Sequence, residues 1–431
     1  MASGWGLRPA RALFFGLKGQ EATVTGGSSF LKSGHTPTLF SAFLYFDLSF
    51  MVWVILGPLG VAISKSLHLT AAQKGFMVAT PLLAGAAFRI LNGVLVDHFG
   101  PKRTGLVAQL VVMAGLLAAW WLGIHNYDQV LLLALVLGVA GASFAIALPL
   151  ASRWYPPRYQ GLALGIAGAG NSGTALAALF APGLAKAYGW TNVIGLAAVP
   201  LALAFLVYLF LAKDAPNPPR AKRLTDYMAV LKTGDCWWLM FLYSVTFGGF
   251  SGLSSSLTIY FNGDYKLDPV IAGFFTAACV LAGSLVRPVG GAVADRIGGV
   301  RTLIGVYIVA VLGLAVVSLH LPNAWAALAA VMVSMGALGA GNGAVFQLAP
   351  QRFAKEIGVI TGVVGAMGGV GGFYLASTLG LSKQLTGSYQ AGFLGFAGLA
   401  LIALVALGLV KAHWRARWPQ LAGADAMPVR V

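Results

Sequence analysis

The chain has 431 residues, of which 58% are hydrophobic and only 9% carry a charged side chain. Soluble domains carry about 25% charged residues, so this composition excludes a soluble globular fold and indicates a polytopic membrane protein. The formal net charge of +16 could suggest a nucleic-acid-binding protein, but the distribution of that charge, described below, excludes this interpretation.

Twelve apolar segments recur along the chain. Each is long enough to cross a bilayer as a helix, which takes about 20 residues. We expect an all-α protein rather than a barrel, because the segments are long and continuous and because lipid offers no partners to unpaired backbone groups. The segments lie near residues 38–64, 71–97, 101–125, 128–154, 159–187, 190–212, 236–262, 268–295, 300–320, 323–350, 357–382 and 389–412.

These segments form two pseudo-symmetric halves of six helices each. The basic, proline-rich run at 213–223 is typical of a loop and marks the connection between them. We therefore expect five parts in order: a cytoplasmic tail at 1–37, an N-terminal half at 38–212, a cytoplasmic linker at 213–234, a C-terminal half at 235–412 and a cytoplasmic tail at 413–431.

Basic residues are distributed unevenly over the loops. With both termini in the cytoplasm, nearly all loop lysines and arginines face the cytoplasm; those outside are Lys65, Lys74, Lys186, Lys266 and Lys383. This asymmetry follows the positive-inside rule. It predicts a multi-pass protein of the cytoplasmic (inner) membrane with both termini in the cytoplasm, and it accounts for the net charge without a nucleic-acid partner.

One arginine lies inside the second apolar segment and another at the matching place in the eighth. Arg89 and Arg287 are 198 residues apart, close to half of the chain. An arginine in hydrocarbon costs roughly 2.5 kcal/mol or more, so a charge in this position indicates a function. Two matched halves that each place one arginine in the membrane predict a transporter with an anion site between them.

A short motif follows each arginine at the same spacing. Gly93 and Asp97 follow Arg89, and Gly291 and Asp295 follow Arg287. The glycines would let helices pack closely, and the aspartates would pair with loop cations or a helix N-terminus in one conformation. We interpret these four residues as gating residues rather than as substrate ligands.

The fifth and eleventh segments are rich in glycine at matching positions. Glycine lowers helix propensity, and its benefit in a membrane is the close approach of two backbones. One such run means little alone, but two copies at a constant offset of 197 residues support a duplicated fold. The expected packing glycines are Gly165, Gly168 and Gly170 in the first copy and Gly362, Gly365 and Gly368 in the second.

The first segment contains Asp47, the only carboxylate inside an expected span and away from its ends. Two interpretations stay open. Asp47 is either structural, through an ion pair or a hydrogen-bonded helix bend, or it is a proton-coupling group whose protonation responds to burial and to a nearby arginine.

The loop motif from Gly93 to Arg103 resembles the loop signature of the major facilitator superfamily. Together with the two arginines and the paired glycine runs, it resembles the nitrate–nitrite porter (NarK-type) family, from about residue 40 to 414. Matched position by position, the resemblance implies that the anion is clamped by Arg89 and Arg287, oriented by Asn171 and enclosed by Phe144, Tyr243 and Phe247. The second signature has Gly368 where an asparagine would complete the symmetry, so the implied site is asymmetric.

The resemblance implies transport by alternating access, either proton-coupled nitrate import or, as the alternative, nitrate/nitrite antiport. The same arginines could serve a phosphate or carboxylate porter, and a non-transporting anion sensor is a further alternative. The residues show no nucleophile–base set and no Cys/His spacing typical of a metal site, so we expect no enzyme, no cofactor and no metal. We expect a monomer in the lipid bilayer, with nitrate, nitrite and protons as its small partners.

Overall fold

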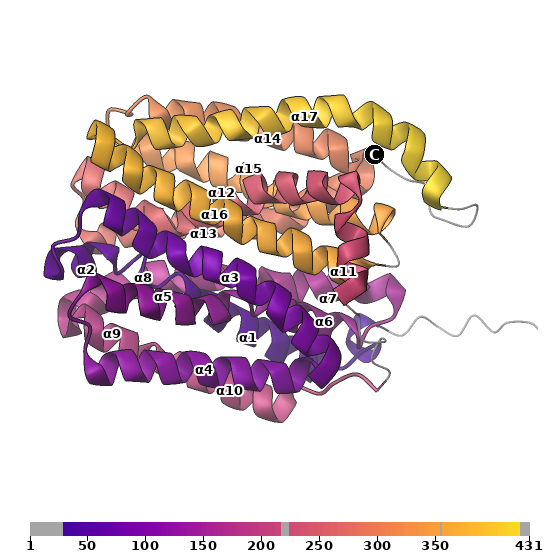
Figure 1. Cartoon of the computed structure of the whole chain (residues 1–431), viewed down its shortest axis with the longest axis horizontal. Coiled ribbons are helices and arrows are strands. Elements are labelled where there is room, and N and C mark those ends of the chain that lie inside the picture. Colours follow the sequence, from indigo (N-terminus) through magenta and orange to yellow (C-terminus); the bar gives the residue numbers. More distant parts are fainter. Residues whose placement is uncertain (1–28, 217–223, 354–355, 423–431) are drawn as a thin grey trace, which may run out of the picture.

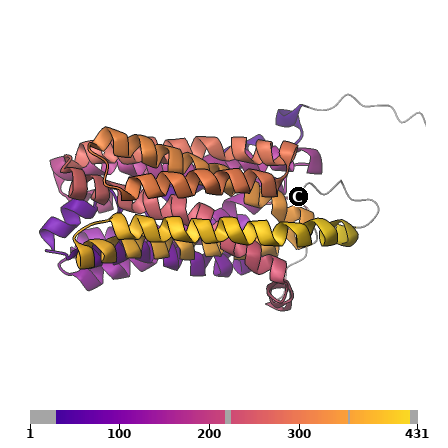
Figure 2. The same cartoon turned by 90° about the horizontal axis from the view of Figure 1, so that it is seen from above.

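The computed structural model describes residues 29–216, 224–353 and 356–422, and in these ranges the secondary structure is helical. The helices form two bundles that lie side by side, the N-terminal half in indigo to magenta and the C-terminal half in orange to yellow (Figure 1). Turned by 90°, the molecule shows helices of both halves along the same long axis (Figure 2). The predicted all-α membrane fold is confirmed.

Eleven helices among the described residues are long and apolar enough to cross a membrane. The first expected span is the exception, because it consists of α1 (Thr36–Trp53) and α2 (Gly60–Ser66), with turns at 54–59 between them. Pro58 in the turns has no N–H to donate to a helix. A Cβ on Gly57 would overlap the carbonyl oxygen of Ser255. The backbone at this interruption therefore lies close to the other half. With α1 and α2 counted as one span, the structure contains all twelve expected segments.

The other five spans of the N-terminal half lie close to their expected places. Three of them change helix type or direction part-way, and Pro149 lies inside one of these helices. Their helices are α3 (Ala71–Phe99), α4 (Pro101–Leu122), α5 (Tyr127–Gly141) with α6 (Phe144–Ser152), α7 (Pro157–Gly168) with the 3-10 turn η2 (Ala169–Ser172) and α8 (Gly173–Tyr188), and α9 (Trp190–Leu196) with α10 (Ala198–Leu211).

The C-terminal half consists of six continuous helices. They are α12 (Gly234–Tyr265), α13 (Pro269–Ile297), α14 (Gly299–Ser318), α15 (Ala324–Arg352), α16 (Ile357–Thr386) and α17 (Gln390–Ala422). A short helix, α11 (Leu224–Leu231), lies in the segment expected to be linker.

The last helix, α17, continues to Ala422, past the expected end of the half at residue 412. Trp414 and Trp418 are four residues apart and therefore share one face of the extension. Both side chains are buried, and their rings stack with centroids 4.6 Å apart. The expected tail therefore begins as a helix that packs on the bundle.

The turns after α3 and α13 repeat the duplication seen in the sequence. Gly100 and Gly298 have φ angles of 83° and 98°, in a region that side chains rarely adopt. They are 198 residues apart, as are the two arginines. Each glycine ends one spanning helix and lets the chain turn directly into the next.

The two halves meet closely at one end of the bundle, which we call the far end because the linker lies at the other, the linker end. A Cβ on Gly75 of α3 would lie 2.7 Å from Cα of Gly380 in α16. Nearby, the N–H of Ala71 donates to Gln384 Oε1 at 3.1 Å. The far end is thus closed by backbone contact between α3 and α16.

An ion pair also joins the halves at the far end. Lys186 of α8 lies 3.4 Å from Asp268, the N-cap residue of α13. The N–H of Val270 donates to Asp268 and lowers its pKa, so this carboxyl is charged at neutral pH. Both partners are exposed, so the pair contributes about 1 kcal/mol or less.

Toward the linker end, the glycine-rich runs do not make the expected close contacts. A Cβ on Gly165, Gly168 or Gly362 would have no heavy atom within 4 Å. The prediction of helix packing at these three glycines is therefore wrong for this conformation, in which the halves are closed at the far end and these positions face open space. Gly170 and Gly368 do pack closely, since a Cβ on either would lie 2.6 Å from a phenylalanine ring atom.

Candidate anion site between the two halves

Arg89 is buried on α3 at the interface between the halves, with 1% of its surface exposed. Its Nε donates to the carbonyl oxygen of Gly141 at 3.1 Å, and its Nη1 donates to the carbonyl oxygen of Gly365 in the other half. Its Nη2 has no partner among the described residues. Backbone carbonyls thus fix the guanidinium through Nε and Nη1, while Nη2 stays available to bind a ligand.

Aromatic rings surround the Arg89 guanidinium. Its Cζ lies 5.0 to 5.9 Å from four ring centroids, a distance at which a cation is attracted to the ring face. Two rings, Phe144 and Phe247, belong to the implied set; the other two, Phe50 and Trp53 of α1, were not predicted. The site therefore excludes water around the charge instead of hydrating it.

Arg287 on α13 reaches the same place from the other half. Its Cζ lies 5.9 Å from the Phe144 ring, and the Arg89 Cζ lies 5.4 Å from that ring. The two charges are close enough to interact unfavourably. Nη1 of Arg287 has no partner among the described residues. The structure thus brings the two predicted arginines together around one ring.

The remaining aromatic residues form a continuous wall. Tyr243 and Phe247 stack at 5.2 Å with an interplanar angle of 9°. Phe346 of α15 meets the Tyr243 ring edge-on at 4.9 Å and lies 6.0 Å from Phe144. The predicted Phe144, Tyr243 and Phe247 therefore meet, and Phe346 joins them, although sequence reasoning had not selected it.

Two buried asparagines have no hydrogen-bond partner for either side-chain amide atom among the described residues: the predicted Asn171 and the unpredicted Asn342. Asn171 lies on η2. Gly173, the residue directly after η2, lies against the backbone of Asp47. An unpaired buried polar group costs about 1–3 kcal/mol. These two amides are therefore candidate ligands for an anion bound between the halves.

Asn342 lies on α15 at the level of the arginines. Gly341 packs against Thr246, and Gly343 packs against the backbone of Arg287. Asn342 is also four residues before Phe346 and so shares a helix face with it. The isolated amide between two glycines in an apolar span was the signal that could have identified it.

Asp47 is buried in α1 and accepts a hydrogen bond from Ser172 Oγ at 2.7 Å. The ion pairs within the described residues do not include it. The interpretation of Asp47 as the ion-pair partner of a buried arginine is therefore not supported. It lies instead beside η2, the turn that carries Asn171.

A scan of family models matches residues 39–376 to the Major Facilitator Superfamily. The probable nitrate/nitrite transporter NarK2 of Mycobacterium tuberculosis is 33% identical over 356 residues, which covers 80% of this chain and 89% of that protein. The nitrite extrusion protein of Bacillus subtilis is 31% identical, over 80% of this chain and 87% of that protein. The chain belongs to the nitrate/nitrite porter (NarK-type) family of the Major Facilitator Superfamily.

A further relative and two solved structures also align with the chain. The probable nitrate/nitrite antiporter NarK1 of Thermus thermophilus is 29% identical, over 81% of this chain and 86% of that protein. The crystal structure of a D-xylose-proton symporter aligns with a TM-score of 0.71 at 13% identity, over 86% of this chain and 97% of that one. A bacterial homolog of the lysosomal transporter Spinster, inward-facing and occupied, aligns with a TM-score of 0.69 at 16% identity, over 88% and 97%. These two structures show the fold alone.

The predicted gating residues of the porter lie at the linker end. Asp97 on α3 forms an ion pair of 3.0 Å with Arg153, the residue that follows α6 in the same half. A Cβ on Gly291 would lie 3.9 Å from Gly343, so α13 and α15 are close there. Gly93 is partly exposed and Asp295 is exposed near the end of its helix. The ion pair of Asp97 is thus made within one half.

The described part of the porter contains no group of three or more His, Cys, Asp or Glu residues that could hold a metal ion. Cys236 and Cys279 are buried, free thiols. The chemistry available at the site is therefore that of two guanidinium groups, a phenol, two amides and a ring of aromatic side chains.

Proposed function

We propose that this porter imports nitrate across the cytoplasmic membrane by alternating access, coupled to protons. The observation that carries the proposal is the pair of guanidinium groups near the Phe144 ring, Arg89 buried and Arg287 partly buried, each with a buried nitrogen that has no hydrogen-bond partner among the described residues. One anion between the two guanidinium groups would neutralise part of their positive charge and accept a hydrogen bond from each. Nitrate is named in several relatives, including NarK2 of Mycobacterium tuberculosis.

The properties of nitrate match this donor set. It is a small, flat, weakly hydrated monoanion, and a planar guanidinium presents fixed, forked donors that suit an oxyanion. Aromatic walls such as the stacked Tyr243 and Phe247 suit its flat faces. A divalent, strongly hydrated phosphate would lose more hydration on entering such a site, so we favour nitrate over phosphate.

Orientation follows from the distribution of charge. We place the linker end in the cytoplasm, because the basic linker and α17 extension lie there, as the positive-inside rule requires. The far end, where α3 contacts α16, then faces the outside of the cell. In this orientation the conformation with open space before Gly165, Gly168 and Gly362 is the one that opens toward the cytoplasm.

Import against a negative-inside potential needs a coupled ion. Moving one anion inward is opposed by about 2.3 kcal/mol per 100 mV, and cotransported protons reverse this. Asp47 is a buried carboxyl beside η2, where its protonation can respond to an anion at Asn171. We therefore assign proton coupling to Asp47.

Nitrate/nitrite exchange is the second candidate. It is favoured by relatives named as a nitrite extrusion protein and as a probable nitrate/nitrite antiporter. Exchange of one monoanion for another is electrically balanced and needs no protonatable group, so the two modes differ in their dependence on Asp47.

Uptake of labelled nitrate into proteoliposomes separates the candidates. We expect a pH gradient, acidic outside, to drive accumulation by the wild type, and Asp47→Asn to keep nitrate/nitrate exchange but lose accumulation. The asparagine can still accept the Ser172 hydrogen bond, so the fold is preserved. Accumulation by the variant would make Asp47 structural. If nitrate uptake by the wild type does not change with the pH gradient but increases with nitrite inside the vesicles, the protein is an antiporter. Transport of phosphate instead of nitrate would refute the assignment of nitrate as the substrate.

A further inference from the structure

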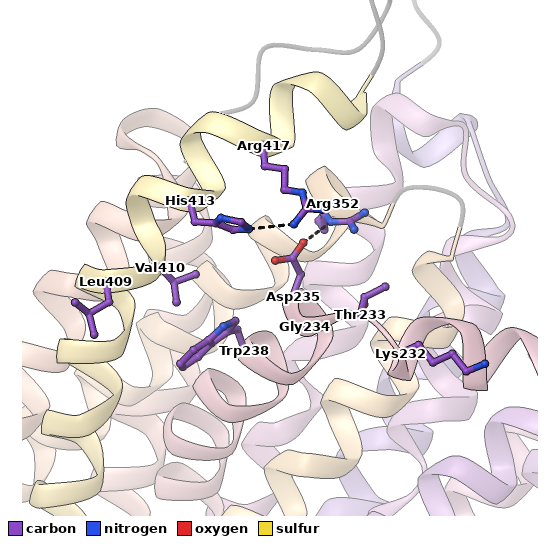
Figure 3. Close-up of a pocket in the computed structure, with 10 residues that line it drawn as sticks. All are labelled: Lys232, Thr233, Gly234, Asp235, Trp238, Arg352, Leu409, Val410, His413 and Arg417. Atoms are coloured by element: carbon purple, nitrogen blue, oxygen red, sulfur yellow. Dashed lines mark hydrogen bonds and ion pairs between the residues drawn. The ribbon is translucent and has the colours of Figure 1, made fainter.

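A second group of cationic side chains surrounds a cavity of about 500 Å³ at the linker end of the C-terminal half (Figure 3). It is separate from the site between the halves and is built from the start of α12, the end of α15 and the extension of α17. Its basic lining residues are Lys232, Arg352, His413 and Arg417. A volume of this size fits a small ligand or a lipid headgroup.

The one carboxylate in the cavity wall, Asp235, is already fully engaged. Its Oδ2 accepts from Arg352 Nε and from the indole N–H of Trp418 at 3.3 Å, and its Oδ1 accepts from the indole N–H of Trp414 at 2.9 Å. Asp235 therefore neutralises Arg352 and holds the α17 extension in place. It does not neutralise the other cations of the cavity.

Lys232 and Arg417 thus leave the cavity with a formal charge of +2, since Arg352 and Asp235 cancel. Arg417 lies 3.4 Å from His413 Nε2, a neutral partner when that nitrogen accepts. Figure 3 shows Arg417 and Arg352 approaching each other above Asp235, while Lys232 lies at the rim. Arg417 and Arg352 are like charges that lie close together, an arrangement that a bound anion stabilises, whereas Lys232 stands apart from them in the same view.

Three apolar side chains make up another part of the cavity wall. Trp238, Leu409 and Val410 line it, and Leu409 has 76% of its surface exposed. Leu409 lies on α17 in the apolar part of the helix, whereas Arg417 is eight residues later, about 12 Å further along. The cavity therefore presents cations at the membrane surface and hydrocarbon just below it.

We propose that this cavity binds an anionic phospholipid of the cytoplasmic leaflet, with the phosphate on Arg417 and Lys232 and the first part of an acyl chain along Leu409 and Trp238. A soluble phosphate would use the cations but would leave the apolar wall uncovered. The proposal uses the orientation argued above and does not depend on the transported substrate.

The cavity also adjoins the transport helices. Asp235 lies in the first turn of α12, and Tyr243 lies eight residues later on the same helix, about 12 Å away. A lipid held between α12 and α17 would fix the position of both helix ends. Occupancy of the cavity therefore connects the lipid composition of the membrane with the C-terminal half.

Native mass spectrometry of the full-length protein in detergent tests the proposal, because no bulk membrane surface contributes there. We expect phosphatidylglycerol to be retained in preference to phosphatidylcholine. Each basic residue near an anionic lipid contributes about fivefold in affinity, so Lys232→Gln with Arg417→Gln should weaken phosphatidylglycerol binding about twenty-fivefold. Glycerol 3-phosphate at millimolar concentration should not displace the lipid.

The matched control removes the same charge from the same region. Lys411 and Arg415 lie on α17 but do not line the cavity, so Lys411→Gln with Arg415→Gln should change the affinity less than about twofold. Equal losses in both double variants, or no preference for phosphatidylglycerol, would overturn the proposal. Binding of glycerol 3-phosphate as tight as that of the lipid would make this a site for a soluble anion instead. Lys232→Gln alone, at the exposed rim, repeats the test if the double variant is unstable.

Discussion

The two halves of the porter supply one arginine each, but they hold the two side chains differently. Arg89 is bound by two backbone carbonyls and enclosed by four rings. Arg287 has two rings near its guanidinium and an Nη1 without a partner in the described residues. The duplication therefore preserved the charge and not its surroundings. Arg89 acts as a fixed anchor, and Arg287 is the partner that can adjust to the anion.

The same divergence appears at other paired positions. An offset of 198 residues places Asn342 opposite Phe144 and Val245 opposite Asp47. The N-terminal half thus has a carboxylate at a position where the C-terminal half has valine, and each half contributes one amide, from a helix that does not match that of the other. Proton coupling, on our proposal, belongs to the N-terminal half alone.

The largest effect of this difference between the halves is expected at the glycine runs. Gly168 faces open space in the N-terminal half, whereas its counterpart Gly365 lies against Phe144, with a Cβ 3.5 Å from the ring. We expect Gly168→Leu to fold with an unchanged thermal unfolding temperature but to reduce nitrate uptake below detection, because the leucine prevents closure of the linker end. Gly365→Leu should lower the unfolding temperature as well. Normal uptake by Gly168→Leu would mean that this surface never closes.

Arg89→Lys should lower uptake by about a hundredfold or more. A lysine keeps the charge but loses the fork that bonds two carbonyls, and hydrogen bonds to charged groups contribute about 1.5–3 kcal/mol each. Initial rates of labelled nitrate uptake by reconstituted protein measure the effect. Near wild-type rates would refute the role of Arg89 as an anchor.

Arg287→Lys should lower uptake less, by about tenfold. The lysine cannot donate two parallel hydrogen bonds to the anion, but its introduction removes no hydrogen bond to the backbone like those of Arg89. The comparison is made at equal protein density in the same vesicles. Equal losses in Arg89→Lys and Arg287→Lys would show that the asymmetry of their surroundings has no functional effect.

The smallest effect on transport is expected for Asn342, the amide that the sequence analysis did not identify. Asn342→Leu should raise the KM for nitrate about fivefold, since one hydrogen bond contributes about 1 kcal/mol. Gln109 on α4 is the control, because both its amide atoms are also buried and unpartnered among the described residues. Gln109→Leu should leave the KM unchanged. A similar rise in both variants would assign the effect to the fold.

The spans could be predicted from the sequence, and so could the meeting of Arg89 and Arg287 near one ring, because apolar runs and charges within them are rare signals in a sequence. The role of the two arginines stays a prediction. Sequence reasoning did not identify Phe346 or Trp53 as neighbours of the clamp, because an aromatic residue in an apolar helix has the same pattern whether it faces the site or the lipid. The break between α1 and α2 was also missed, although Gly57 and Pro58 mark it. The extension of α17 depends on the tertiary bonds of Asp235 and so has no local signal.

The hydrogen bond from Arg89 to the carbonyl of Gly365 has a kinetic consequence, because it joins α3 of one half to α16 of the other. Any rocking of the halves that separates these helices must break it. When an anion lies on the guanidinium, that loss is compensated; when the carrier is empty, it is not. The loaded carrier should therefore cross faster than the empty one, so that counterflow of nitrate outpaces net uptake and the return of the empty carrier limits turnover.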